Sequence, residues 1–153
     1  MAAMDFFGTA ALVLLLLPVL VLPWGGKGVP ALHFAIIAGA GLAAAWLTGG
    51  AAALLASALS GAVSMLSIAV AVTALKSWQG VQILTGSHIQ LLATGAIWLG
   101  PVGSLLMLSF SSIFLFSSAF INKANGQLRR PDFFAIGVSA ILIVQTGQIF
   151  TKH

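Results

Sequence analysis

Acidic residues are almost absent from this chain of 153 residues, which has two carboxylates, Asp5 and Asp132. Charged residues make up 5% of the sequence and apolar residues 60%, whereas about a quarter of a typical soluble domain is charged. A water-facing surface cannot be built from this composition, so the sequence predicts an integral membrane protein. Paired-carboxylate catalysis is disfavoured, because it needs converging groups and the two acids lie at opposite ends of the chain.

Cysteine is also absent, which excludes disulfides, thiolate nucleophiles and the usual zinc sites. The formal net charge is +4, but the scattered Lys and Arg residues make no patch of the kind that binds nucleic acid. We expect these charges to orient helices in a bilayer. We expect no nucleic-acid partner, no cofactor and no metal ion.

The apolar stretches are continuous and do not alternate with polar residues, which favours helices over a barrel. A helix needs about 20 apolar residues to cross the hydrocarbon core, and breaks at Gly, Pro and charged residues divide the chain into six predicted spans within a single domain, 1–153. The spans run roughly from Asp5 to Leu22, Pro30 to Leu47, Ala51 to Leu75, Gln79 to Leu99, Pro101 to Ile121 and Asp132 to Ile149. In the fourth, only Ile89 to Leu99 is strongly apolar, so a short or re-entrant helix is an alternative.

Orientation follows from the basic residues, because Lys and Arg near helix ends are retained in the cytoplasm. With six spans, five basic residues share one face of the membrane and Lys152 alone lies on the other: the five are Lys27, Lys76, Lys123, Arg129 and Arg130. Both termini are therefore predicted on the non-cytoplasmic side. At the start of the last span, Asp132 is expected to cap the helix.

Small residues in the second and third spans include Gly39, Gly41 and Gly61. Gly, Ala and Ser at helical spacing let two helix backbones approach closely. We therefore expect the second and third helices to pack as a tight hairpin, and a bulky residue at Gly41 or Gly61 to disturb packing.

Two histidines are the ionisable groups closest to the membrane interior. His33 and His88 each follow a basic loop and are placed to face one another across a shallow cytoplasmic cavity, which would also contain Thr85, Ser87 and Gln90. Two histidines alone make a poor zinc site, although an ionisable residue inside a membrane is a functional hypothesis by default. The plainer alternative, which we favour, is a histidine that hydrogen-bonds a carbonyl group or water.

Other polar and aromatic residues have structural interpretations. Gln145 and Gln148 in the last span mark either a helix interface or a wet lining. The tryptophans lie near predicted helix ends, where indoles anchor at the membrane interface; they are Trp24, Trp46, Trp78 and Trp98.

The stretch from Thr85 to Pro101 resembles the central segment of the prepilin leader peptidases, the GxGD-type membrane aspartic proteases of type IV and Flp pilus systems. In that family the segment reads roughly G-x-G-D-x-K-L-L-A-A-x-G-x-x-L-G. Gly28 to Pro30 is similar to the family's I-P-N segment, and Arg130 to Gly137 to the opening of its last helix. The resemblance implies a six-helix bundle in the inner membrane of a bacterium.

The family's catalytic positions are not kept. Its two aspartates would fall near Pro23 or Trp24 and on His88, and none of these residues is a carboxylate. Without both carboxylates, the shared-proton dyad of an aspartic protease cannot form. The motif glycines are replaced by Thr85 and Ser87 and the motif lysine by Gln90, so the resemblance implies a degenerate, inactive member.

The leading functional hypothesis is a pseudoenzyme: a non-catalytic, prepilin-peptidase-like scaffold or subunit that contacts the lipid bilayer and other membrane proteins. For this role we expect His88→Ala to be nearly silent. One alternative is a membrane protease of the same type with a rebuilt active site that uses His33 and His88. Another is an unrelated accessory subunit of a respiratory, photosynthetic or transport complex.

Overall fold

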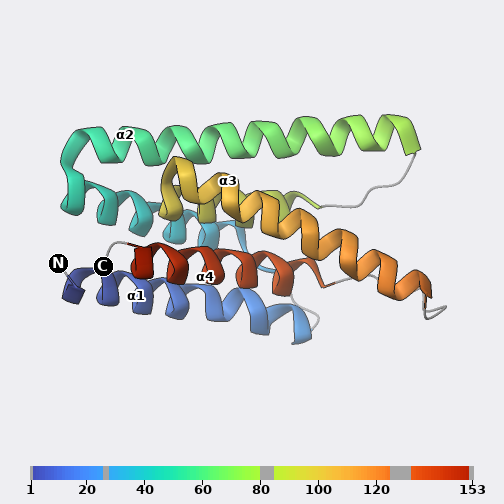
Figure 1. Cartoon of the computed structure of the whole chain (residues 1–153), viewed down its shortest axis with the longest axis horizontal. Coiled ribbons are helices and arrows are strands. Elements are labelled where there is room, and N and C mark those ends of the chain that lie inside the picture. Colours follow the sequence, from blue (N-terminus) through green and yellow to red (C-terminus); the bar gives the residue numbers. More distant parts are fainter. Residues whose placement is uncertain (1, 26–27, 80–84, 125–131, 152–153) are drawn as a thin grey trace.

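The structure is a computed structural model that describes residues 2–25, 28–79, 85–124 and 132–151. These residues form four α-helices and one short 3-10 helix (Figure 1), namely α1 (Ala2–Val21), η1 (Leu22–Gly25), α2 (Ala31–Gln79), α3 (Gly86–Ala124) and α4 (Phe133–Thr151). The predicted all-helical class is confirmed.

Helices α2 and α3 each bend sharply at one glycine. Gly50 has φ 63° and ψ −153°, and Gly100 has φ 68° and ψ −173°, a backbone region that is open essentially to glycine alone. The bends divide α2 into α2a (31–49) and α2b (51–79), and α3 into α3a (86–99) and α3b (101–124). Pro101 suits the first position of α3b, because the N–H that proline lacks has no helical partner there.

Three of these helices are long and apolar enough to cross a membrane. The candidate segments in the described residues are Ala31–Ala74 of α2, Gly86–Leu115 of α3 and Phe133–Phe150 of α4, with 44, 30 and 18 residues, and the apolar segment Phe7–Val21 of α1 is shorter. The sequence predicts six spans, whereas length and hydropathy of these helices give three. Part of the difference arises at Gly50 and Gly100, where two predicted spans belong to one bent helix.

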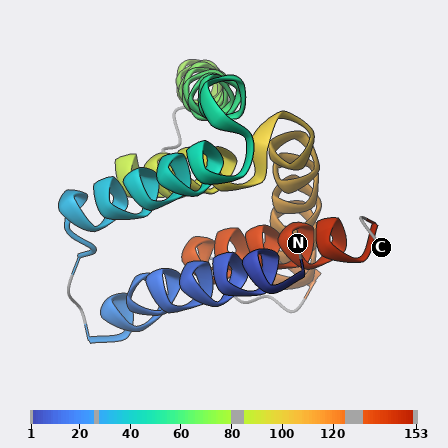
Figure 2. The same ribbon diagram turned by 90° about the vertical axis from the view of Figure 1, so that its left-hand side faces the viewer.

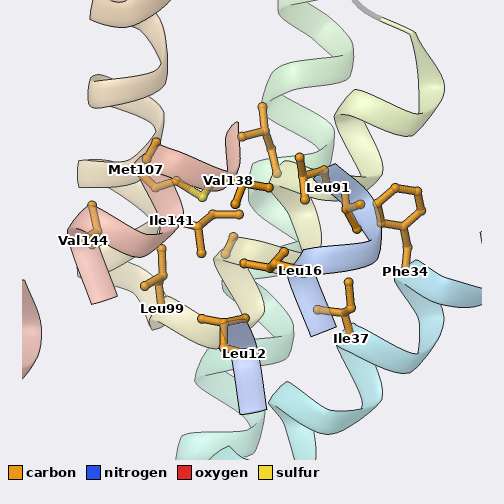
Figure 3. Close-up of a cluster of buried hydrophobic side chains, with 14 of the residues drawn as sticks. Leu12, Leu16, Phe34, Ile37, Leu91, Leu99, Met107, Val138, Ile141 and Val144 are labelled. Atoms are coloured by element: carbon orange, nitrogen blue, oxygen red, sulfur yellow. The ribbon is translucent and has the colours of Figure 1, made fainter. Parts of the chain in front are cut away.

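The α3a segment lies at the centre of the bundle. Residues 91–96 are all buried, and the hydrophobic core gathers around them (Figure 3), with Leu12 and Leu16 from α1, Ile37 from α2a and Ile141 from α4. The α3a segment, 86–99, is a short regular helix with buried residues at its centre, which agrees with the alternative of a short fourth helix. A helix that is apolar on every face is typical of such a buried position.

Glycines bring two segments of α2 against α3a. A Cβ atom on Gly41 would lie 2.7 Å from Cδ1 of Trp98, and one on Gly61 would collide with Ile97. Both glycines thus face α3a, whereas the sequence predicts that their helices pack on each other through them. A Cβ on Gly39 would meet nothing within 4 Å, so no helix packs against that position.

Two hydrogen bonds join the same helices through backbone carbonyl groups. Ser60 Oγ of α2b donates to the carbonyl oxygen of Ala96 at 2.7 Å, and Trp98 Nε1 donates to that of Ile37 in α2a at 2.8 Å. Side-chain hydrogen bonds of this kind hold helices together in lipid. Trp98 therefore binds a neighbouring helix, and the interfacial position of its indole stays a prediction.

The helices are arranged so that α1 begins and α4 ends at the same end of the molecule as the bend in α2. Helices α2 and α3 end at the opposite end (Figure 1). Seen along its axis in Figure 2, α2b lies beyond α2a, on the side away from α1 and α4. Most of the surface of α2b is therefore left without a neighbour.

Candidate functional site

The start of α3 is built around His88. The backbone N–H of Thr85 donates to His88 Nδ1 at 3.1 Å, and Thr85 Oγ1 lies 2.9 Å from the same nitrogen. His88 is the third residue of α3. A side chain at this position that accepts a hydrogen bond from the N–H of the residue just before the helix forms half of a capping box. Glu or Gln is the usual residue there. Because a backbone N–H only donates, Nδ1 is the acceptor and cannot carry a proton while this bond exists.

The other contacts of His88 are with α4. Its ring lies 5.1 Å from the ring of Phe133 and 4.5 Å from that of Phe134, measured between centroids. These phenylalanines form the first turn of α4. The imidazole therefore joins the beginnings of α3 and α4, which lie side by side.

Asp132 caps α4, as predicted from the sequence. Its Oδ1 accepts hydrogen bonds from the backbone N–H groups of Phe134 and Ala135, both at 3.1 Å. The carboxylate satisfies two donors at the positive end of the helix dipole. The role of this acid is structural.

His33 has a separate partner. Its Nε2 lies 2.8 Å from the carbonyl oxygen of Leu15 in α1, so the imidazole N–H donates to that carbonyl and joins α1 to α2a. This is the plainer of the two roles considered for the histidines. In the described part of the chain, no three His, Cys, Asp or Glu residues are grouped so that they could hold a metal ion.

The remaining predicted residues are divided between two places. Thr85 and Ser87 share the turn that holds His88, with their hydroxyl oxygens 3.1 Å apart, and Gln90 is half-buried one turn further along. Pro23 lies in η1. The side chain of Trp24 is outside the described residues.

A cavity of about 920 Å³ was not predicted from the sequence. It lies among all the α-helices, beside the bend at Gly100. Small residues of α2 form one wall, and these are Gly41, Ala44, Ala45 and Ala53. Large apolar residues of α3b and α4 form the other, and these are Val102, Leu106, Phe110 and Ile143. None of the lining residues is charged.

Gln145 and Gln148 are the residues whose polarity in an apolar helix could have indicated this cavity. Both line it, and both also join helices: Gln145 Nε2 donates to Thr9 Oγ1 at 3.3 Å, and Gln148 Nε2 to the carbonyl oxygen of Leu99 at 3.2 Å. The helix-interface interpretation agrees with these hydrogen bonds, and the wet lining stays a prediction. The lining offers hydrogen bonds and apolar contacts and no nucleophile with an adjacent base, so it is suited to binding.

Comparison with known proteins gives no relative: no family model, no curated protein and no solved structure matches this chain. The resemblance to prepilin peptidases remains a prediction from the sequence.

The capping role of His88 predicts an ordered series of variants, and it replaces the expectation that His88→Ala is silent. Gln keeps an acceptor for the Thr85 N–H, so His88→Gln should retain most of the stability. His88→Leu keeps the apolar contact without the acceptor and should lower the free energy of unfolding by about 1 kcal/mol. Thermal unfolding in detergent, followed by circular dichroism, measures both. Equal stability of the two variants would exclude a capping contribution.

Proposed function

We propose that this chain is a non-catalytic polytopic membrane protein that serves as a scaffold or subunit of a membrane protein complex. The proposal keeps the sequence-based hypothesis of a distant, inactive relative of the prepilin peptidases in a bacterial inner membrane. Its main support is the large unpartnered surface of α2b.

That surface is a continuous apolar stripe. Five residues of α2b at helical spacing are each at least 60% exposed, and they are Leu55, Leu59, Val63, Leu66 and Val70. Apolar side chains in this number are covered in the cell by lipid or by another protein. In lipid, helices associate through shape and packing, and a long helix held on one side only offers such a surface to a partner.

The reactive groups are used to hold the bundle together. His33 binds a carbonyl group of α1, His88 binds the N–H before α3, and Asp132 caps α4. A rebuilt protease site needs a base and an acid directed at one substrate position. The observed partners favour the scaffold over that alternative.

We also propose six spans for the membrane topology. A straight helix of the 49 residues in α2 would be about 70 Å long, more than twice the bilayer core of about 30 Å. The bends at Gly50 and Gly100 reverse the chain, so that each half can cross separately, with α3a short and enclosed by protein. The ends of α2 and α3, just after Lys76 and Lys123, lie at the opposite end of the molecule from the beginning of α1 and the end of α4. This arrangement agrees with a cytoplasmic position of the basic residues.

Cysteine labelling tests this topology, and the chain contains no native cysteine. With six spans, Ala51→Cys at the bend should react with a membrane-impermeant maleimide in intact cells, whereas Asn125→Cys should react only after permeabilisation. If α2 instead crossed once, residue 51 would lie inside the membrane and react from neither side. Labelling of both positions in intact cells would also contradict the proposal.

Photo-crosslinking tests the scaffold role. A photoreactive amino acid at Leu59 or Leu66 of α2b should give a discrete crosslinked protein in native membranes, which mass spectrometry then identifies. Leu14 of α1, 69% exposed, is the matched control for an exposed leucine elsewhere and should give lipid adducts. Lipid adducts alone at all three positions would contradict a partner on α2b.

A further inference from the structure

The cavity beside Gly100 has the size and chemistry of a binding site for an apolar molecule. Its volume of about 920 Å³ falls within the range of roughly 300–1,000 Å³ that is usual for ligand pockets, and such pockets occur between the helices of bundles. The lining contains no charged residue, so nothing in it offsets the cost of removing an ion from water. The occupant must be neutral where it touches the cavity.

The shape of the cavity follows from the residues around it. On α2a, Gly41, Ala44 and Ala45 present little more than backbone, which leaves space in front of that helix. On the opposite side, the bend at Gly100 directs α3b across the molecule (Figure 2), and α3b approaches α4 where a Cβ on Gly103 would lie 2.6 Å from Nε2 of Gln148. Space therefore remains between α2a and the pair formed by α3b and α4.

The rim of the cavity lies on the exposed apolar surface of the bundle. Val102, Leu106 and Phe110 line the cavity at successive turns of α3b, and Ile143 lines it from α4. All four are also exposed, Val102 to 70%. An apolar chain in the bilayer can thus pass from the outer surface to the lining without crossing a polar barrier, whereas a solute from water meets an apolar rim.

Two polar groups at the wall are directed at the protein, whereas Oε1 of Gln145 is buried without a hydrogen-bond partner among the described residues. Trp98 Nε1 donates to Ile37, and Gln148 Nε2 donates to Leu99. The indole ring of Trp98 remains as an apolar surface of the cavity. We infer that this cavity binds an acyl chain of a membrane lipid, which enters across the exposed apolar rim described above. This inference is independent of the scaffold proposal.

Quenching of Trp98 by brominated lipid tests the inference. The probe is a variant that keeps Trp98 alone, with Trp24, Trp46 and Trp78 changed to Phe, in vesicles of phosphatidylcholine with brominated acyl chains. Trp98 emission should fall strongly relative to vesicles without bromine. Ala44→Phe fills the cavity and should restore most of that emission, whereas Ala62→Phe, at an exposed position of α2b outside the cavity, should leave the quenching unchanged.

A second variant that keeps Trp46 alone controls for insertion and folding. Trp46 is 54% exposed and does not line the cavity, so it should be quenched with or without Ala44→Phe. Unquenched Trp98 beside quenched Trp46 would overturn the inference and leave the cavity empty or filled by a partner helix. Quenching of Trp98 that Ala44→Phe does not change would also overturn it, because the lipid would then reach the indole from outside the cavity.

Discussion

The structure depends on one packing constraint: the backbones of the neighbouring helices must come close enough to α3a to enclose it. The hydrophobic effect does not drive helices together in lipid, so close packing and hydrogen bonds must do so. Gly41 and Gly61 of α2 meet α3a directly, and Gly137 of α4 admits Leu91 at 3.0 Å from the position of a Cβ. Ser60 and Trp98 also donate hydrogen bonds to backbone carbonyl oxygens across these helix contacts.

The rest of the molecule follows from that centre. The first turns of α3 and α4 are fixed by ionisable side chains, His88 at α3 and Asp132 at α4. Beyond Gly100 the chain leaves the centre, and the close packing gives way to the cavity. Helix α2b contacts α3a on one side and exposes the apolar stripe on the other. The proposed partner surface and the proposed lipid site are thus two places where apolar side chains of the bundle are left exposed.

Several local features could be predicted from the sequence because they depend on neighbouring residues. The all-helical class follows from composition, the bends fall at the predicted breaks before Ala51 and Pro101, and the cap at Asp132 follows from its place before an apolar run. The central position of α3a could not be predicted. In a membrane protein, apolarity reports contact with lipid as well as burial. An 18-residue stretch of the α3 segment is less apolar than one of the α2 segment, with mean hydropathy 1.8 against 2.0, yet 56% of the α3 stretch is buried against 28% of the α2 stretch. The partner of Trp98 and the cavity depend on residues from distant helices, which no local pattern reveals.

The most direct test of the central claim compares two glycines on opposite faces of α2a. Gly41→Ala places a methyl group against the Trp98 ring, which is held by its bond to Ile37, whereas Gly39→Ala enters open space. Unfolding of each variant in mixed micelles of increasing denaturing detergent gives the loss of stability. The account predicts a loss of about 1–3 kcal/mol for Gly41→Ala, as for other overpacked cores, and none for Gly39→Ala. Equal stability of the two variants would contradict an α3a enclosed by close backbone contact.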